Sequence, residues 1–127
     1  MSFRWITKPE VIAIHQEQLS EHGGLTGIRD EGLLDSAIAR PINLYNYESQ
    51  GIAKYAAAYA FGIIRNHPFN DGNKRTGFVT ALTFLLLNGH YTKLTEPDVV
   101  LTISKLAAGK VSEEALSEWI ENSLVSV

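Results

Sequence analysis

Residues 67–78 read His-Pro-Phe-Asn-Asp-Gly-Asn-Lys-Arg-Thr-Gly-Phe and lie between the two most apolar segments of the chain. Pro68 predicts the end of the preceding helix, because a proline disfavours helical geometry in the residue before it and has no amide hydrogen. Gly72 permits a backbone turn that other residues resist, and Asn73 is a favourable N-cap for the helix that follows. The stretch therefore predicts two helices joined by a short polar loop, with His67 at the end of the first.

The opening turn of the second helix predicts a site for an anion. Amides in the first turn of a helix have no intrahelical acceptor, and the helix dipole adds positive charge there. Two cationic side chains lie in the same turn, and phosphate is the anion that helix N-termini commonly hold. The residues expected to bind phosphate are Gly72, Asn73, Lys74 and Arg75.

His67 and Asp71 complete the set that group transfer needs. Mg²⁺ is commonly held by one or two carboxylates together with phosphate oxygens and water, so Asp71 is predicted to be a metal ligand. An imidazole with an ordinary pKa near about 6.5 can accept a proton from an attacking hydroxyl, so His67 is predicted to be the general base. Base, metal ligand and phosphate site together indicate transfer of a group from a nucleoside triphosphate.

Each of these residues also has a plainer interpretation. The His67 ring could bond a backbone carbonyl at the helix end, and Asp71 could be a capping residue. Both could be ligands of a zinc site, although no third ligand has suitable spacing. Their occurrence beside two cations favours a functional site, because a structural turn needs neither a base nor positive charge. Phe69 is expected to pack the loop into the core.

The same stretch resembles the signature of the Fic/Doc family, His-Pro-Phe-x-Asp/Glu-Gly-Asn followed by Gly or Lys and then Arg. Adenylyltransferases of that family usually have Gly where this chain has Lys74, and a second Arg where it has Phe78. In both respects the chain is similar to the Doc (death on curing) branch, the toxins of Phd/Doc toxin–antitoxin systems. Further likeness lies at residues 23–27, 29–34 and 88–89.

The resemblance implies a protein kinase that transfers the γ-phosphoryl group of ATP, with Mg²⁺, to a hydroxyl of a target protein. The implied target is a threonine of translation elongation factor Tu, and the implied outcome is arrest of protein synthesis. The implied partner is a small Phd-type antitoxin whose C-terminal segment folds on binding and blocks the site. Two alternatives stay open, namely adenylyl transfer with the nucleotide reversed and a non-catalytic nucleotide-binding module. Lys74 and Phe78 favour phosphoryl transfer.

Ser117, Glu121 and Asn122 match a degenerate pattern of the family's inhibitory helix. In that family the glutamate pairs with the second Arg of the signature, and this chain has Phe78 there. Glu121 is therefore interpreted as a solvated residue of the last helix, and inhibition within the chain is the weaker hypothesis.

The hydrophobic pattern predicts an all-α fold, as a single domain spanning residues 1–127 with about six helices around the motif-flanking pair. The resemblance implies that this domain is of Fic/Doc type. Residues 43–51 are interpreted as a polar connection and as the candidate for a flap, which in Fic-like proteins docks the target by strand addition. An ordinary surface loop is the alternative. Residues 90–94 are β-prone. The expected helices cover residues 8–22, 30–40, 52–66, 74–88, 95–108 and 112–124.

Five other polar residues have plain interpretations. His15 and His22 are expected to face solvent or to lie at a helix end, since neither has a neighbouring acid or nucleophile pattern. Helix caps and surface ion pairs account for Arg29, Asp30 and Arg40.

Composition narrows the class of protein. The 127 residues are 45% hydrophobic and 20% charged, which suffices for one core. A net charge of −3 argues against nucleic acid as the main partner, and the positive charge is expected locally, from Arg65, Lys74 and Arg75. The absence of cysteine excludes disulfides and thiolate metal sites. No secretory signal or long apolar run is visible, so a cytoplasmic protein without a membrane partner is expected.

Overall fold

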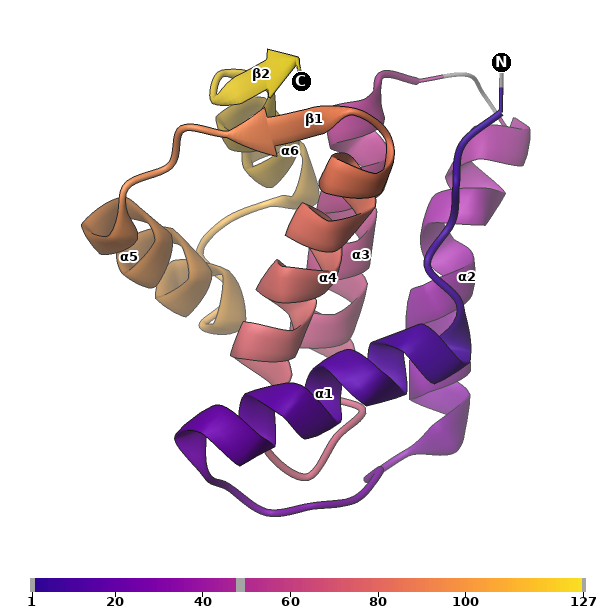
Figure 1. Ribbon diagram of the computed structural model, residues 1–127, viewed down its shortest axis with the longest axis vertical. Coiled ribbons are helices and arrows are strands. Elements are labelled where there is room, and N and C mark those ends of the chain that lie inside the picture. Colours follow the sequence, from indigo (N-terminus) through magenta and orange to yellow (C-terminus); the bar gives the residue numbers. More distant parts are fainter. Residues whose placement is uncertain (1, 48–49, 127) are drawn as a thin grey trace.

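The computed structural model describes residues 2–47 and 50–126, which form six helices and one two-stranded sheet (Figure 1). The helices are α1 (Lys8–His22), α2 (Glu31–Tyr47), α3 (Ile52–Asn66), α4 (Asn73–Leu87), α5 (Glu96–Ala107) and α6 (Glu113–Glu121). The strands β1 (His90–Thr92) and β2 (Leu124–Ser126) pair antiparallel. The predicted all-α class is confirmed, with the small sheet as an addition to it.

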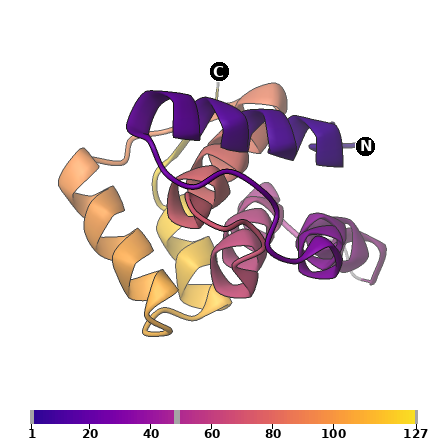
Figure 2. The same ribbon diagram turned by 90° about the horizontal axis from the view of Figure 1, so that it is seen from below.

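Helices α3 and α4 form the centre of the fold. Helix α3 packs against α4, α2 and α6, and α1 crosses α4 close to the loop that joins the pair (Figures 1 and 2). Gly77 of α4 allows the close approach, because a Cβ atom there would lie 2.7 Å from Cγ1 of Ile64 and 3.2 Å from the carbonyl oxygen of Ala60. Close packing of the two helices holds both ends of the 67–72 loop in place.

Helix α2 runs further than the sequence predicted. It continues through Pro41 to Tyr47, although a proline inside a helix removes one hydrogen bond and bends the axis. Pro41 is buried, and the next turn packs Leu44 and Tyr45 against the core, which offsets that cost. The prediction of a connecting flap is therefore wrong for residues 43–47, which are helical, while residues 48 and 49 lie outside the described residues.

The C-terminal helix ends earlier than predicted. Helix α6 stops at Glu121, and Leu124 pairs with Thr92 across the sheet instead of extending the helix. This strand pairing satisfies backbone groups of the β-prone segment after α4, which therefore does form a strand. The hydrophobic pattern of neighbouring residues cannot predict a pairing between two strands that lie far apart in the sequence.

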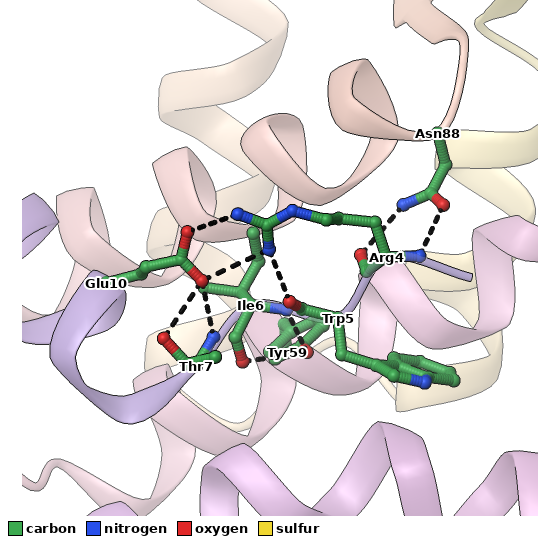
Figure 3. A network of polar contacts seen from close by, with 7 residues as sticks. All are labelled: Arg4, Trp5, Ile6, Thr7, Glu10, Tyr59 and Asn88. Carbon is green, nitrogen blue, oxygen red and sulfur yellow. Dashed lines mark hydrogen bonds and ion pairs between the residues drawn. The ribbon is translucent and has the colours of Figure 1, made fainter.

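The N-terminal segment is fastened to three helices by a polar network (Figure 3). The Tyr59 hydroxyl of α3 accepts from the amide of Ile6 at 2.9 Å and donates to its carbonyl at 3.2 Å. The Asn88 side chain, at the end of α4, accepts from the amide of Arg4 at 2.8 Å and donates to its carbonyl at 3.0 Å. The Arg4 guanidinium binds Glu10 of α1 at 2.7 Å. Burial raises the pKa of Tyr59 to about 12, so its hydroxyl stays protonated in this network.

The Glu10 carboxylate makes the stability of this network dependent on pH. Its hydrogen bond with Arg4, followed by that with the Thr7 amide, lowers the pKa of Glu10 from 4.5 to about 2. Because the folded pKa is the lower one, ionised Glu10 stabilises the fold above about pH 4.5, and this contribution is lost as the pH falls through about 2.

We expect Glu10→Gln to reduce the free energy of unfolding by roughly 1 kcal/mol at neutral pH, a value discounted for the partial exposure of the pair. Urea unfolding at about pH 7 and about pH 2 measures it, and the difference from wild type should be much smaller at the lower pH. Glu17→Gln, at an exposed position of the same helix, is the matched control and should change neither value. An equal loss at both pH values would contradict the assignment.

Over the ranges that the structure describes, no helix has the length and apolar character that crossing a bilayer requires.

Candidate active site

The residues predicted to form the site line one cavity of about 510 Å³ between the 67–72 loop, α4 and α5. Helix α5 contributes a mostly apolar wall to the cavity, with Val99, Val100 and Ile103. The predicted site residues in its lining are His67, Asp71, Gly72, Asn73, Lys74 and Arg75. The opening turn of α4 is therefore accessible, with room for an anion.

His67 is the C-cap of α3 and has a left-handed backbone, with φ 53° and ψ 54°. Within the described ranges it is the one residue other than glycine with a positive φ, which an L-residue adopts only when its surroundings hold it there. Its amide donates to the carbonyl of Ile63 at 3.1 Å, and its carbonyl accepts from Nε of Arg29 at 2.7 Å. The side chain is exposed, and no described residue hydrogen-bonds the imidazole, so both ring nitrogens are free for a ligand.

Asp71 is held as an ionised carboxylate. Oδ2 accepts from the amide of Leu25 at 3.1 Å and Oδ1 from the amide of Gly72 at 2.9 Å. These two hydrogen bonds, the Leu25 one first, lower the pKa of Asp71 below its usual 3.8, and the charge of Arg75 acts in the same direction. Each carboxylate oxygen keeps lone-pair capacity for a cation.

Asp71 suits a cation that takes most of its ligands from elsewhere. Among the described residues, no group of three or more His, Cys, Asp or Glu side chains could hold a metal ion. Mg²⁺ fits this arrangement, because one carboxylate with phosphate oxygens and water satisfies its octahedral shell.

Helix α4 begins one residue earlier than predicted, and its N-cap is Gly72 instead of Asn73. Gly72 has φ 78°, a left-handed conformation that glycine adopts without strain. Asn73 is 3% exposed. Its side-chain Oδ1 accepts a hydrogen bond from the amide of Phe69 at 3.0 Å, and Nδ2 donates to the carbonyl of Phe69 at 2.9 Å. Asn73 therefore closes the loop with its side chain and can offer only its backbone amide to an anion.

Lys74 and Arg75 follow in the first turn of α4 with exposed side chains. Arg65, which was expected to add charge here, lies elsewhere, because its guanidinium donates to the carbonyls of Leu106 and Ala107 at the end of α5. A cation at a helix C-terminus interacts favourably with the helix dipole. The positive charge at the cavity accordingly comes from two cations of α4 and the α4 N-terminus.

The glycine-rich segment before α2, residues 23–28, holds the 67–72 loop, which we also call the motif loop. The sequence pattern did not predict this role. The two stretches run antiparallel, and Ile28 bridges Phe69. The amide of Asn70 donates to the carbonyl of Gly27 at 3.1 Å. Gly24 lies so close to the loop that a Cβ atom on it would be 2.8 Å from Oδ2 of Asp71. The repeated glycines were the available signal, since glycine marks positions where backbones approach closely.

Arg29 has a role that the sequence did not predict, whereas Asp30 has the predicted one. Arg29 donates from Nε to the carbonyl of His67 at 2.7 Å and from Nη2 to that of Asn66 at 3.0 Å, so it holds the end of α3. Asp30 caps α2 as predicted, with Oδ1 accepting from the amide of Leu33 at 2.9 Å. The predicted ion pair of Arg40 is also confirmed, and its partner is Glu113.

The expectation for His15 is wrong. Its side chain is 4% exposed, and its ring stacks on Phe69 with 3.8 Å between the centroids and 8° between the planes. Nε2 lies 2.8 Å from the carbonyl oxygen of Asp71. Full burial of Phe69 confirms that this residue packs the loop into the core. His22 is exposed at the end of α1, as expected.

The residues of the inhibitory-helix pattern lie outside the cavity. Ser117 is buried, whereas Glu121 is exposed at the end of α6 and faces a separate groove beside Lys54. This placement agrees with its interpretation as a solvated residue.

Comparison with known proteins assigns the family. The sequence profile of the Fic/DOC family matches residues 5–85, a range that includes the whole motif loop. The chain belongs to the Fic/DOC family. This membership confirms the resemblance that the motif indicated.

Two curated relatives of this Fic/DOC chain carry informative names. "Protein kinase doc" of Escherichia phage P1 is 33% identical over 118 residues, which cover 92% of this chain and 93% of the relative. "Toxin Doc" of Mycolicibacterium smegmatis is 45% identical over 69 residues, which cover 53% of each protein. The likeness to the first relative extends beyond the range of the family profile, into the part of the chain that holds α5 and α6.

Proposed function

We propose that this chain is a toxin of Doc type that transfers the γ-phosphoryl group of Mg²⁺-ATP to a hydroxyl of a target protein. The observation that carries the proposal is that His67, Asp71 and the cationic first turn of α4 line the same cavity. The name of the phage P1 relative, a protein kinase matched over 93% of its length, supports phosphoryl transfer over other reactions.

The first turn of α4 binds the phosphates in this proposal. Its amides point out of the helix without intrahelical acceptors, and the helix dipole adds to the charges of Lys74 and Arg75. Asp71 holds the cation, which neutralises phosphate charge when it is bound. The apolar wall of α5 offers a surface for the nucleoside, since cofactor sites commonly combine a few polar groups with apolar walls.

His67 acts as the base. Its free imidazole accepts the proton of the target hydroxyl while the hydroxyl oxygen forms a bond to the γ-phosphorus. The bond between this phosphorus and the oxygen that bridges to the β-phosphate breaks, and ADP leaves. The strained left-handed backbone at His67 is held by Arg29, so the position of this residue at the cavity is fixed before substrate arrives.

The identity of the macromolecular partners follows from the family resemblance and belongs to the proposal. The target is a threonine of elongation factor Tu, and its phosphorylation arrests translation. A Phd-type antitoxin blocks the site, and its segment becomes ordered on binding.

Adenylyl transfer is the second candidate, because the base, carboxylate and phosphate site also suit it. At the position where adenylyltransferases of the family carry a second arginine, Phe78 is half-buried, and its ring centroid lies 6.5 Å from that of Trp119. An aromatic residue packed toward α6 supplies no charge for a second phosphate contact. This observation favours phosphoryl transfer.

Labelled ATP distinguishes the candidates. The chain is incubated with purified elongation factor Tu, and separately with a cell extract, with label on either the α- or the γ-phosphate. Label that arrives only from the γ position supports the proposal, and label only from the α position supports adenylyl transfer. Bound ATP with no transfer of either label would leave a nucleotide-binding module and overturn both.

We expect Lys74→Ala to raise the Kd for Mg²⁺-ATP by about 10- to 100-fold, the cost of one charge-assisted contact. Titration calorimetry measures this value directly. Lys93→Ala, which removes an exposed lysine after β1, is the matched control and should leave the Kd unchanged. Equal affinities of the two variants would place the phosphates away from the first turn of α4.

A further inference from the structure

His15 is a buried polar side chain that the proposed reaction does not use. It lies on α1, is 4% exposed, and contacts two residues of the motif loop from outside the motif. The ring stacks on Phe69 at 3.8 Å, and Nε2 lies 2.8 Å from the carbonyl oxygen of Asp71. The distance is that of a hydrogen bond, and a buried imidazole without such a partner would cost free energy of folding.

The identity of the acceptor determines which ring nitrogen carries hydrogen. A carbonyl oxygen only accepts, so the contact is a hydrogen bond only when Nε2 is protonated. Within the described residues, His15 is the one donor to the carbonyl of Asp71. The backbone of the metal-ligand candidate is therefore oriented by a side chain of a different helix.

The Asp71 peptide links two parts of the candidate site. Its carboxylate is held by the amides of Leu25 and Gly72, and its carbonyl by His15, so side chain and backbone are fixed separately. The imidazole also lies against the turn that starts α4, since a Cβ atom on Gly72 would be 3.6 Å from Cδ2 and 3.7 Å from Nε2 of His15. A rotation of this peptide would displace both the carboxylate and the first amides of α4.

We infer that His15 is a positioning residue of the active site, whose Nε2–H group holds the Asp71 carbonyl and thereby orients the carboxylate and the opening turn of α4. The stack on Phe69 serves packing, and the hydrogen bond serves activity. The kinetic consequence of this inference rests on the proposed function.

Three substitutions separate the hydrogen bond from the packing. Glutamine carries its amide nitrogen as many bonds from Cβ as Nε2 lies in histidine, whereas the asparagine nitrogen falls short. His15→Gln therefore keeps a donor within reach of the carbonyl. His15→Asn is its matched control, because it has the same amide group on a side chain that is too short. His15→Phe keeps a ring on Phe69 and removes the donor.

We expect kcat for transfer of γ-labelled phosphate to fall by about tenfold or more in His15→Asn and His15→Phe, the usual effect of losing a partner that orients a metal ligand. His15→Gln should recover kcat to within about threefold of wild type. KM for ATP should rise in His15→Asn and His15→Phe but stay within about twofold of wild type in His15→Gln, because the opening turn of α4 that His15 orients binds the phosphates. Melting temperatures are measured in parallel, so that the Gln and Asn variants are compared as folded proteins.

Two readouts do not depend on catalysis. Nitrogen-15 spectra of the imidazole should show a protonated Nε2 in His15 of the wild-type chain. Titration with inorganic tripolyphosphate and Mg²⁺, followed at the Gly72 amide, should give weaker binding for His15→Asn than for His15→Gln. If the wild-type chain transfers no label, the proposed function fails, and these two measurements still test the positioning.

The inference is overturned by wild-type kcat in His15→Asn and His15→Phe, or by a glutamine variant no better than the asparagine variant. An unprotonated Nε2 would overturn it as well. If the wild-type chain transfers no label, equal tripolyphosphate affinities of the Gln and Asn variants would also overturn the inference.

Discussion

Replacing His67 by alanine is expected to lower the rate of γ-phosphoryl transfer by about 10²- to 10⁴-fold, the usual contribution of a general base. The cavity stays open and the first turn of α4 is untouched, so the affinity for Mg²⁺-ATP should remain nearly that of wild type. Single-turnover transfer from γ-labelled ATP measures the rate, and calorimetry measures the affinity.

His22→Ala is the matched control for the His67 substitution. His22 is an exposed histidine at the end of α1, so its loss should leave the rate unchanged. A wild-type rate in His67→Ala would refute the assignment of the base. A loss of ATP affinity as large as the loss of rate would instead indicate that His67 contributes to binding.

Replacing Phe69 by alanine is expected to reduce the free energy of unfolding by about 3–5 kcal/mol, the usual cost of deleting a buried aromatic side chain. Phe69 is fully buried, stacks on His15 and has both of its backbone polar groups bonded to the side chain of Asn73. Urea unfolding followed by the fluorescence of Trp5 and Trp119 measures this loss.

Two controls accompany the Phe69 substitution. Phe69→Leu keeps most of the apolar volume and should cost clearly less than the alanine variant. Leu25→Ala changes a side chain that is 70% exposed, so it should leave the free energy of unfolding almost unchanged. An alanine variant of Phe69 within about 1 kcal/mol of wild type would show that the loop is not anchored by this ring.

Much of the fold could be predicted because its signals are local. The bounds of α1 and α3 agree with the predictions, since Pro9 near the start of α1 and Pro68 after the end of α3 act on adjacent turns. The prediction failed at Pro41, where packing of the following turn against the core outweighs the local preference. It also failed to include the sheet, because β1 and β2 come from opposite sides of α5 and α6 in the sequence.

The candidate site also has a part that the sequence predicted and a part that it did not. The sequence predicted which residues of the motif form the site, and the structure places all of them in the lining of one cavity. The residues that hold the motif were missed or misassigned, and Arg29 and His15 are the main examples. Both bind backbone carbonyls, and a carbonyl leaves no mark in the sequence that would identify its partner.

The sequence by itself determined the chemical groups of this protein and their order along a helix–loop–helix, because proline, glycine and charge act over a few residues. The tertiary structure alone decided how these groups are held. The left-handed turn at His67, the carboxylate of Asp71 and the start of α4 are each fastened by contacts from α1 or the segment after it. Such contacts depend on how helices pack in space, and packing is determined by the whole core instead of by neighbours in the chain.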